Sequence, residues 1–384
     1  MKILFMVWES LGGKNMLEAL INLGYEVELY DFSANKDKSK RQNLMEELTL
    51  KIISSGCKYV FSFNYFSNVA IACKACKVTY VSWVYDSPCL ELYSSTINFE
   101  TNRVFVFDSF ECQKLNSLGV STVEYLPLAS AAKSYDKAIK SAVDCEKYRC
   151  DIAFVGAIKT ESDKEKFHRF DKLDQYTKGY LDGVIQAQKH VYGYNFVEST
   201  LTGDIINNLQ KVFPISIKDD SIAEPKWIYS NYYINQRITG LERTEIIKML
   251  SEDYNFNLYT LEETPLLPKT HNMGEVNYYT EAPLAFYNAK INLNISTRSI
   301  QNGIPLRALD IMGAHGFLLT NYQSDFERFF IPNEDFVYYE SYDDLASKVD
   351  YYLNHEEERK AIAENGYNKV KKFHSYADRI KVMF

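Results

Sequence analysis

The segment INLNISTRSIQNGIPLRALDIMG places two arginines, a glycine, a proline and a carboxylate directly after an apolar run. Arg298 lies in the polar loop, and Gly303 and Pro305 lead into a helix that carries Arg307 and Asp310. The free N–H groups and the dipole at a helix start favour a phosphate. Arginines nearby add charge-assisted and potentially bidentate hydrogen bonds. We therefore predict that this loop binds the phosphates of a ligand.

Asp310 follows Arg307 by three residues, so both side chains lie on nearly the same face of the predicted helix. A carboxylate in that position can accept hydrogen bonds from both hydroxyls of a ribose. An Arg–Asp pair at this spacing is also a common surface pair that contributes little to stability. The residues by themselves leave both interpretations open.

The elements that must position this loop follow an alternating strand and helix pattern. In the first 130 residues the runs KILFMVW, YEVELYDF, KYVFSFN, VTYVSWVY and RVFVFDS are continuously apolar and are separated by helical patterns. Continuous runs indicate strands that are covered on both faces, as in a parallel sheet. Ligands bind beyond the carboxyl ends of such strands, which is where the Arg298 loop lies.

A polar stretch, SAAKSYDKAIKSAVDCEKYRC, precedes a new strand signal in DIAFVGAIKT. We place a domain boundary there, which gives a first domain over 1–150 and a second over 151–384. The second domain repeats the strand and helix alternation, except that residues 161–240 are charged, Tyr-rich and predominantly helical in pattern. We predict that they form a helical insertion after the first strand of the second domain.

The chain has 384 residues, with 43 Lys and Arg against 51 Asp and Glu and a net charge of −8. This length favours two domains, and the acidic balance argues against nucleic acid as a partner. No stretch approaches the roughly 20 apolar residues of a spanning helix, so we expect no transmembrane segment and a cytoplasmic protein. The seven cysteines lack the spacing of a disulfide framework or a zinc site, and we expect structural thiols.

The block GIPLRALDIMGAHGFLLTNYQSDFERFF, together with its flanks FYNAKINLNIS and YYESYDDLASKVDYYLNHEEERKAIAENGYNKV, closely resembles the C-terminal region of the CgeB-like (spore maturation protein) glycosyltransferases. The resemblance continues upstream in FVGAI, TGLERTEII and LYT. It is weaker in WESLGGKNMLEALINLGYEV, WVYDSP, VFVFDS and YLPLA of the first domain. It covers most of the chain apart from 161–240.

The resemblance implies an α/β protein of GT-B fold, with two facing Rossmann-like doubly wound domains. It implies a bacterial hexosyltransferase whose C-terminal domain holds a nucleoside-diphosphate sugar, most often a UDP-sugar, and whose N-terminal domain receives a glycan, protein, cell-surface or spore acceptor. No metal and no cofactor are required in the family. The terminal segment KKFHSYADRIKVMF is expected to cross back to the first domain.

In related GT-B enzymes a Glu-x7-Glu element spans the donor loop and helix, and the matching positions here are Asn302 and Asp310. Asp310 keeps the carboxylate for the ribose, whereas Asn302 lacks the first acid, so the sugar contact and the stereochemical outcome stay open. Gly303, Ile304 and Pro305 complete the donor loop. Two other functions remain open, namely a nucleotide-sugar-binding protein without turnover and a nucleotide-sugar epimerase.

Three further residues are candidates for the donor site. Lys159, after the run IAFVGAI, could reach the same phosphates, although a solvated lysine is an equal alternative. His271 and Asn272 lie in THNMGEVNYY, where the resemblance places a loop near the nucleobase. A lone histidine in a polar loop is more often merely exposed.

The acceptor side is sought in the first domain, again at strand ends. Asp86 in WVYDSP is the preferred general base or acceptor-orienting carboxylate, and capping of the following turn is its alternative. Asp108 and Glu9 are lesser candidates. Gly12 and Gly13 would allow a close approach of the backbone to a phosphate or sugar.

Overall fold

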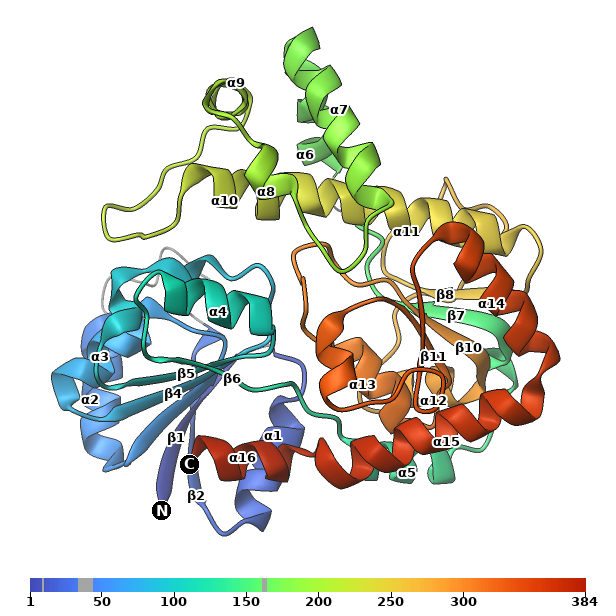
Figure 1. Cartoon of the computed structure of the whole chain (residues 1–384). Helices are drawn as coiled ribbons and strands as arrows, with labels where there is room; N and C mark the ends of the chain where they lie inside the picture. The colour runs from blue at the N-terminus through green and yellow to red at the C-terminus, as the bar shows by residue number, and fades with distance from the viewer. Residues whose placement is uncertain (9, 34–43, 161–163) are drawn as a thin grey trace. The chain divides into compact units, whose positions relative to one another are not determined.

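The structure is a computed structural model that describes residues 1–8, 10–33, 44–160 and 164–384. The chain divides into two compact units, which Figure 1 shows coloured along the chain. The first unit comprises Met1–Ala131, Lys218–Ala223 and His374–Phe384, and the second comprises Ala132–Ile217 and Glu224–Phe373. The division at residue 131 comes earlier than the expected 150. Helix α5 (Ala132–Ser141) packs on three helices of the second unit, namely α12 (Ala282–Asn288), α13 (Leu306–Gly313) and α15 (Glu356–Phe373).

The first unit contains a six-stranded parallel sheet in the order β2-β1-β3-β4-β5-β6. Its strands are β1 (Lys2–Val7), β2 (Glu26–Asp31), β3 (Tyr59–Phe63), β4 (Thr79–Val84), β5 (Asn102–Val106) and β6 (Val123–Tyr125). The connecting helices are α1 (Gly13–Asn22), α2 (Leu44–Ser55), α3 (Ser67–Cys76) and α4 (Ser109–Ser117). Consecutive residues such as Ile3 and Leu4 are both buried, as expected for a continuous apolar run covered on both faces.

The C-terminal helix α16 (Tyr376–Met383) belongs to the first unit and packs against α1. The Arg379 guanidinium fixes its start by donating to the carbonyls of Pro127 and Leu128, at 2.8 and 3.1 Å. The terminal segment that was expected to return to the first domain is therefore part of it.

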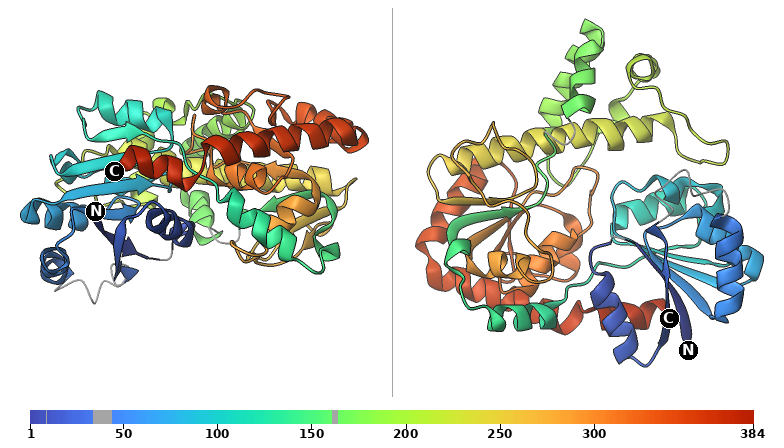
Figure 2. Two further views of the ribbon diagram at one scale, coloured as in Figure 1. Left: turned by 90° about the horizontal axis from the view of Figure 1, so that it is seen from below. Right: turned by 180° about the vertical axis from the view of Figure 1, so that it is seen from behind.

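The second unit contains another six-stranded parallel sheet, in the order β12-β11-β10-β7-β8-β9. Its strands are β7 (Cys150–Val155), β8 (Phe256–Tyr259), β9 (His271–Asn272), β10 (Ala289–Asn294), β11 (Leu318–Asn321) and β12 (Val337–Tyr339). Helices α11 (Asn235–Ser251), α12 (Ala282–Asn288), α13 (Leu306–Gly313), α14 (Tyr342–Asn354) and α15 (Glu356–Phe373) surround the sheet, as Figure 2 shows from two further directions. Each unit is thus a doubly wound α/β layer structure, as the sequence predicts.

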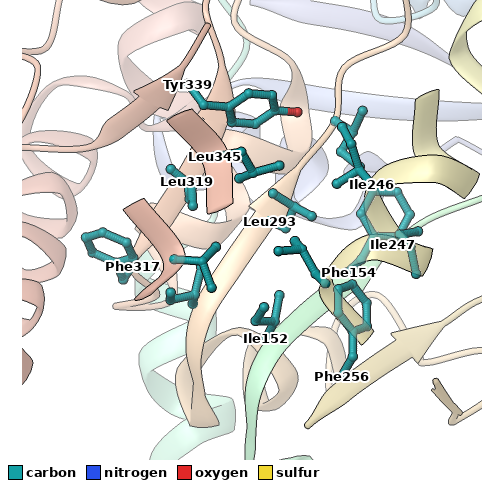
Figure 3. Packing of buried hydrophobic residues seen from close by; sticks show 14 of the residues in the cluster. Ile152, Phe154, Ile246, Ile247, Phe256, Leu293, Phe317, Leu319, Tyr339 and Leu345 are labelled. Atoms are coloured by element: carbon teal, nitrogen blue, oxygen red, sulfur yellow. The ribbon is translucent and has the colours of Figure 1, made fainter. Parts of the chain in front are cut away.

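The core of the second unit joins α11 and α14 to the strands (Figure 3). Phe154 of β7 and Leu293 of β10 pack with Ile246 and Ile247 of α11 and with Leu345 of α14, and all are buried. Burial of each such side chain contributes roughly 1.5–3 kcal/mol. This packing holds α11 firmly against the sheet, and α11 carries the residues that organise the loops at the carboxyl ends of the strands.

The segment between β7 and α11 is helical, as the sequence predicts, and has a core of its own. Its helices are α6 (Lys164–His168), α7 (Gln175–Lys189), α8 (Val197–Thr200), α9 (Gly203–Val212) and α10 (Pro225–Tyr229), and a π-helical turn over Ser230–Ile234 joins α10 to α11. Lys218–Ala223, a short part of this segment, belongs to the first unit. There the Ile222 N–H donates to the Tyr93 carbonyl at 2.7 Å, and Ser94 donates to Asp220 at 3.0 Å.

None of the helices in the described part of the chain has the length and apolar character that crossing a bilayer requires.

Candidate functional site

The carboxyl ends of β7 and β10 are joined by Arg243, a buried residue of α11. Its Nη2 donates to the Ile295 carbonyl at 2.6 Å, and its Nη1 donates to the Ala157 carbonyl at 2.6 Å. Burial lowers the pKa of Arg243 to about 10. Arg243 therefore holds together the two loops on which Lys159 and Arg298 lie.

Arg298 forms a buried ion pair with Glu242, the residue before Arg243 on α11. The Nε and Nη2 atoms of Arg298 lie 2.8 and 2.7 Å from the two Glu242 oxygens, and the two side chains are 9% and 1% exposed. Tyr192 also donates to Glu242, at 2.6 Å, and its ring lies 4.4 Å from the guanidinium carbon of Arg298. The bidentate geometry is that of a strong charge-assisted pair.

The remaining N–H groups of Arg298 tie the donor loop to the helical insertion. Nη1 donates to the Val191 carbonyl at 2.8 Å and Nη2 to the Lys189 carbonyl at 3.0 Å, while Asn195 donates to the Arg298 carbonyl at 2.9 Å. This geometry contradicts the prediction that Arg298 binds donor phosphates, because its guanidinium is buried and already hydrogen-bonded. Arg298 is a positioning residue.

Three consecutive backbone N–H groups after β7 converge on one carboxylate. Ile158 and Lys159 donate to Glu262 Oε1 at 2.8 and 3.0 Å, and Thr160 donates to Oε2 at 3.2 Å. Lys159 has a φ of 71°, a left-handed conformation that turns the following Thr160 N–H toward the same side as its two predecessors. Such an arrangement of amides is an anion-binding nest, and no described carboxylate pairs with the Lys159 ammonium. The sequence gives no sign of Glu262, which lies in the loop after β8.

Asp310 is turned into the second unit, so the Arg307–Asp310 pair is not a surface pair. The carboxylate is 1% exposed, and its Oδ1 accepts hydrogen bonds from the hydroxyls of Tyr135, at 2.6 Å, and Tyr278, at 3.1 Å. Burial is the main reason that the pKa of Asp310 is raised to about 6. Neither tyrosine was predicted, because nothing in the sequence separates them from the other tyrosines.

Two atoms of this pair have no hydrogen-bond partner among the described residues. Asp310 Oδ2 and Arg307 Nη1 are both buried, and they lie 3.8 Å apart. A buried oxygen and a buried N–H without partners are costly, and a single hydroxyl could satisfy both because it donates and accepts. The pair can therefore hold a hydroxylated ligand, and its predicted contact with a ribose remains a prediction.

The donor loop leads into α13 as the sequence predicts. Gly303, Ile304 and Pro305 are buried, Pro305 directly precedes the helix, and the Asn302 carbonyl accepts the Asp325 N–H at 3.0 Å. The N–H groups of the first turn of α13 are thereby placed beside Arg307. Binding of a donor by these four residues remains a prediction.

His271 and Asn272 form the short edge strand β9 and are exposed. The Asn272 side chain closes a turn, since it donates to the Glu262 carbonyl at 3.1 Å and accepts the Gly274 N–H at 3.0 Å. Contact of either residue with a nucleobase remains a prediction. The same loop continues to Tyr278, which reaches Asp310.

In the first unit, Asn64 after β3 holds Asp86 after β4. The Asn64 amide donates to Asp86 Oδ2 at 2.6 Å, and its oxygen accepts the N–H groups of Tyr85 and Asp86 at 2.8 and 3.1 Å. The Asp86 side chain is exposed at the carboxyl edge of the sheet. The position suits an acceptor-orienting carboxylate, which was the preferred prediction.

The other acceptor-side candidates have structural roles or lie elsewhere. Asp108 is buried and caps α4 by accepting the Phe110 N–H at 3.0 Å, so it is not available as a base. Gly12 has a φ of 80°, and a Cβ there would lie 2.2 Å from the Tyr376 hydroxyl, so its close approach is to α16 rather than to a ligand. Gly13 opens α1, and Glu9 lies outside the described residues.

All seven cysteines are free thiols, as expected. In the described ranges, no group of three or more His, Cys, Asp and Glu side chains is arranged to hold a metal ion.

Comparison with known proteins supports the fold. Residues 242–384 match the family model described as "Glycosyl transferase-like". A solved glycosyltransferase from Rickettsia africae is similar over 99% of this chain and 96% of its own, with a TM-score of 0.55 and 11% identity. The chain has the GT-B glycosyltransferase fold. Anabaena Alr3699/HepE in complex with UDP and glucose is similar over 100% of this chain and 98% of its own, with a TM-score of 0.56 and 10% identity.

Sucrose-phosphate synthase from Thermosynechococcus elongatus is a further GT-B neighbour, with a TM-score of 0.54 and 11% identity over 99% of this chain and 97% of its own. No match was found among curated proteins. The matched family region of this GT-B protein begins at Glu242 and includes Arg298 and the whole donor loop. The predicted GT-B fold is confirmed and the glycosyltransferase class is supported, whereas the narrower CgeB-like assignment remains a prediction.

Proposed function

We propose that this GT-B protein transfers a hexose from a UDP-sugar to a glycan or protein acceptor. The observation that carries the proposal is the buried Arg307–Asp310 pair, whose Nη1 and Oδ2 atoms have no hydrogen-bond partner in the described chain. A ribose hydroxyl would satisfy both atoms at once. Tyr135 and Tyr278 both donate to Oδ1, so Oδ2 is the oxygen left for the ribose.

We propose that the donor diphosphate binds where α13 begins. The N–H groups of its first turn, the Arg307 guanidinium and the Lys159 ammonium supply positive charge there. The nest of residues 158–160 supplies three further N–H groups, and Glu262 occupies it in the way that a phosphate would. These groups would stabilise the charge that develops on the leaving diphosphate.

Transfer also requires removal of a proton from the acceptor hydroxyl. We propose Asp86 as the base, held in place by Asn64. The acceptor oxygen forms a bond to the anomeric carbon as the bond from that carbon to the UDP oxygen breaks. UDP leaves with the electron pair, and Asp86 takes the proton.

The choice of UDP is supported by the neighbours. Alr3699/HepE was solved with UDP-glucose, and T4 phage BGT, with a TM-score of 0.50 and 10% identity, was solved with its UDP-glucose substrate. A CgeB-like subfamily, a bacterial source and independence from metal are parts of the proposal that rest on the resemblance of the C-terminal segment.

Product analysis tests the proposal. The full chain is incubated with labelled UDP-glucose and UDP-N-acetylglucosamine, with and without a glycan and protein acceptor mixture. We expect label on an acceptor together with released UDP. Unchanged donor under all conditions would indicate a nucleotide-sugar-binding protein without turnover. Asn302 favours that alternative, because related GT-B enzymes have a glutamate at the matching position. Conversion of the donor sugar without acceptor would indicate an epimerase.

A matched pair of variants separates the roles of the two units. Asp86→Asn should lower the transfer rate by roughly 10²–10⁴-fold and leave UDP binding unchanged. Asp310→Asn should weaken UDP binding. Transfer at the wild-type rate by Asp86→Asn would remove Asp86 from the proposed step.

A further inference from the structure

We propose that the second unit binds a compact phosphate-bearing small molecule at the amino edge of its sheet, in a site separate from the donor site. A cavity of about 190 Å³ lies there, at the starts of β10 and β11 and beside the first turns of α15. A cavity of this size holds several water molecules. The inference goes beyond glycosyl transfer and does not depend on it.

The cavity and the donor loop lie at opposite ends of β10. Lys290, near the start of β10, lines the cavity, whereas the Arg298 loop follows the end of the strand. A six-residue strand spans about 17–20 Å. One ligand of the size of a phosphate ester therefore cannot occupy both places.

The main support for an anion site is the buried guanidinium of Arg359, on α15, in the wall of the cavity. The residue is 6% exposed and lines the cavity, and the one hydrogen bond of its guanidinium within the described chain runs from Nη1 to the Tyr352 carbonyl, at 2.5 Å. A guanidinium has five N–H donors, so the single bond to the Tyr352 carbonyl of α14 leaves most of them unused. Burial lowers the pKa of Arg359, and the charges of Glu356 and Asp151 oppose that shift only in part. An anion in the cavity would supply the missing acceptors.

Two lysines flank Arg359 at the mouth of the cavity. Lys290 pairs with Asp151 at 2.8 Å and Lys360 pairs with Glu356 at 2.5 Å, and both lysine side chains are more than half exposed. Each ammonium has three donors, so both can also contact a ligand. The residues that line the cavity include these three cations and no carboxylate, which favours a phosphate.

The other walls accept the body of the ligand. Phe317 and Ala363 supply apolar surface, and the Tyr287 ring is half exposed at the rim. His315 also lines the cavity. Its two ring nitrogens are occupied by Asp136 and Glu364, at 3.2 and 3.3 Å. Apolar walls with a few convergent charged groups are typical of small-molecule sites.

Isothermal titration calorimetry of the full chain tests the proposal, with glucose 6-phosphate, inorganic phosphate and citrate as probes. We expect glucose 6-phosphate to bind the wild type. Lys290→Gln and Lys360→Gln should each weaken binding at least threefold, and Arg359→Gln at least tenfold. Lys348→Gln, which removes a lysine paired with Asp344 outside the cavity, and Arg307→Gln at the donor loop should bind as the wild type does.

Several outcomes would overturn the proposal. The first is that neither glucose 6-phosphate nor inorganic phosphate binds the wild type. The second is that Lys290→Gln and Lys360→Gln both bind glucose 6-phosphate as tightly as the wild type does. The third is that only citrate binds. Loss of binding in Arg307→Gln with retention in Lys360→Gln would place the phosphate at the donor loop instead. If Arg359→Gln fails to fold, the two lysine variants decide the matter, because their side chains are exposed.

Discussion

The ion pair between Arg298 and Glu242 allows a decisive test of whether Arg298 holds the fold or the donor. Replacement of Arg298 by Met leaves a buried Glu242 carboxylate with the Tyr192 hydroxyl as its hydrogen-bond donor. Removing one partner of a buried pair costs about 3–5 kcal/mol. The same loss is expected for Glu242→Gln, because it leaves the buried guanidinium without its counter-charge.

The double variant Arg298→Met/Glu242→Gln should lose less stability than the sum of the two single variants, since no buried charge is left unpaired. Urea denaturation of all four proteins, followed by far-UV circular dichroism, measures the free energy of unfolding. Since whole proteins are marginally stable by about 5–15 kcal/mol, losses of this size are easily resolved.

Arg307→Met is the matched control at the other end of the donor loop, where the arginine is partly exposed. It should lose clearly less stability than Arg298→Met does, because Arg307 is partly exposed and lies 3.8 Å from its carboxylate, and it should bind UDP at least tenfold more weakly. The reasoning would be refuted if Arg298→Met unfolded like the wild type and lost UDP affinity to the same extent as Arg307→Met. In that case Arg298 would be a donor ligand, as the sequence suggested.

Three further outcomes follow from the structure. The pKa of Asp310 is raised from 3.8 to about 6, so between these pH values the folded state binds a proton that the unfolded state has released. The free energy of unfolding of the wild type should then fall by about 3 kcal/mol as the pH rises through this window. Thermal unfolding measured over a pH series should show this fall in the wild type and not in Asp310→Asn. Gly12→Ala should lower the free energy of unfolding by more than the roughly 1–2 kcal/mol that a left-handed backbone costs a residue with a Cβ, because the new Cβ would clash with the Tyr376 hydroxyl. Adding Tyr376→Phe to Gly12→Ala should recover the part of the loss that exceeds the backbone cost. No recovery in the double variant would contradict the contact. Glu262→Gln should bind UDP about threefold to tenfold more tightly in calorimetry, because a neutral amide binds the three N–H groups less strongly than a carboxylate does and is displaced more easily by a phosphate. Glu263→Gln, at an exposed neighbouring position, is the control. Weaker UDP binding by Glu262→Gln alone would show that the carboxylate assists donor binding.

The strands and the GT-B plan were predictable because their signal is local. Continuous apolar runs give the buried strands of both sheets, and Pro305 with the following periodic residues gives the start of α13. The pairing of Asp310 with Arg307 was predictable because the two residues lie three positions apart on one helix. In each case the information lies within one short segment of the chain.

The parts that failed depend on contacts between distant segments. The sequence predicts a donor ligand at Arg298 because its partner Glu242 lies 56 residues earlier, on α11, and has no local signature. Tyr135 of helix α5 and Tyr278 of the loop before α12 meet at Asp310, and nothing in their neighbourhoods distinguishes them among 30 tyrosines. Gly12 was read as a ligand contact because the approach of Tyr376, which lies near the other end of the chain, has no local signature.

The measurement that tests the central claim most directly is a thermal-shift comparison of UDP, GDP, ADP, CDP and TDP on the wild type, Arg307→Gln and Asp310→Asn, first without metal and then with Mg²⁺. A ligand at 100 times its Kd adds about 2.7 kcal/mol to the folded state. The account predicts that UDP raises the melting temperature of the wild type without metal and that both variants require at least tenfold more UDP for the same rise. Equal stabilisation of all three proteins, or no response of the wild type to any nucleotide, would contradict a donor site at the start of α13.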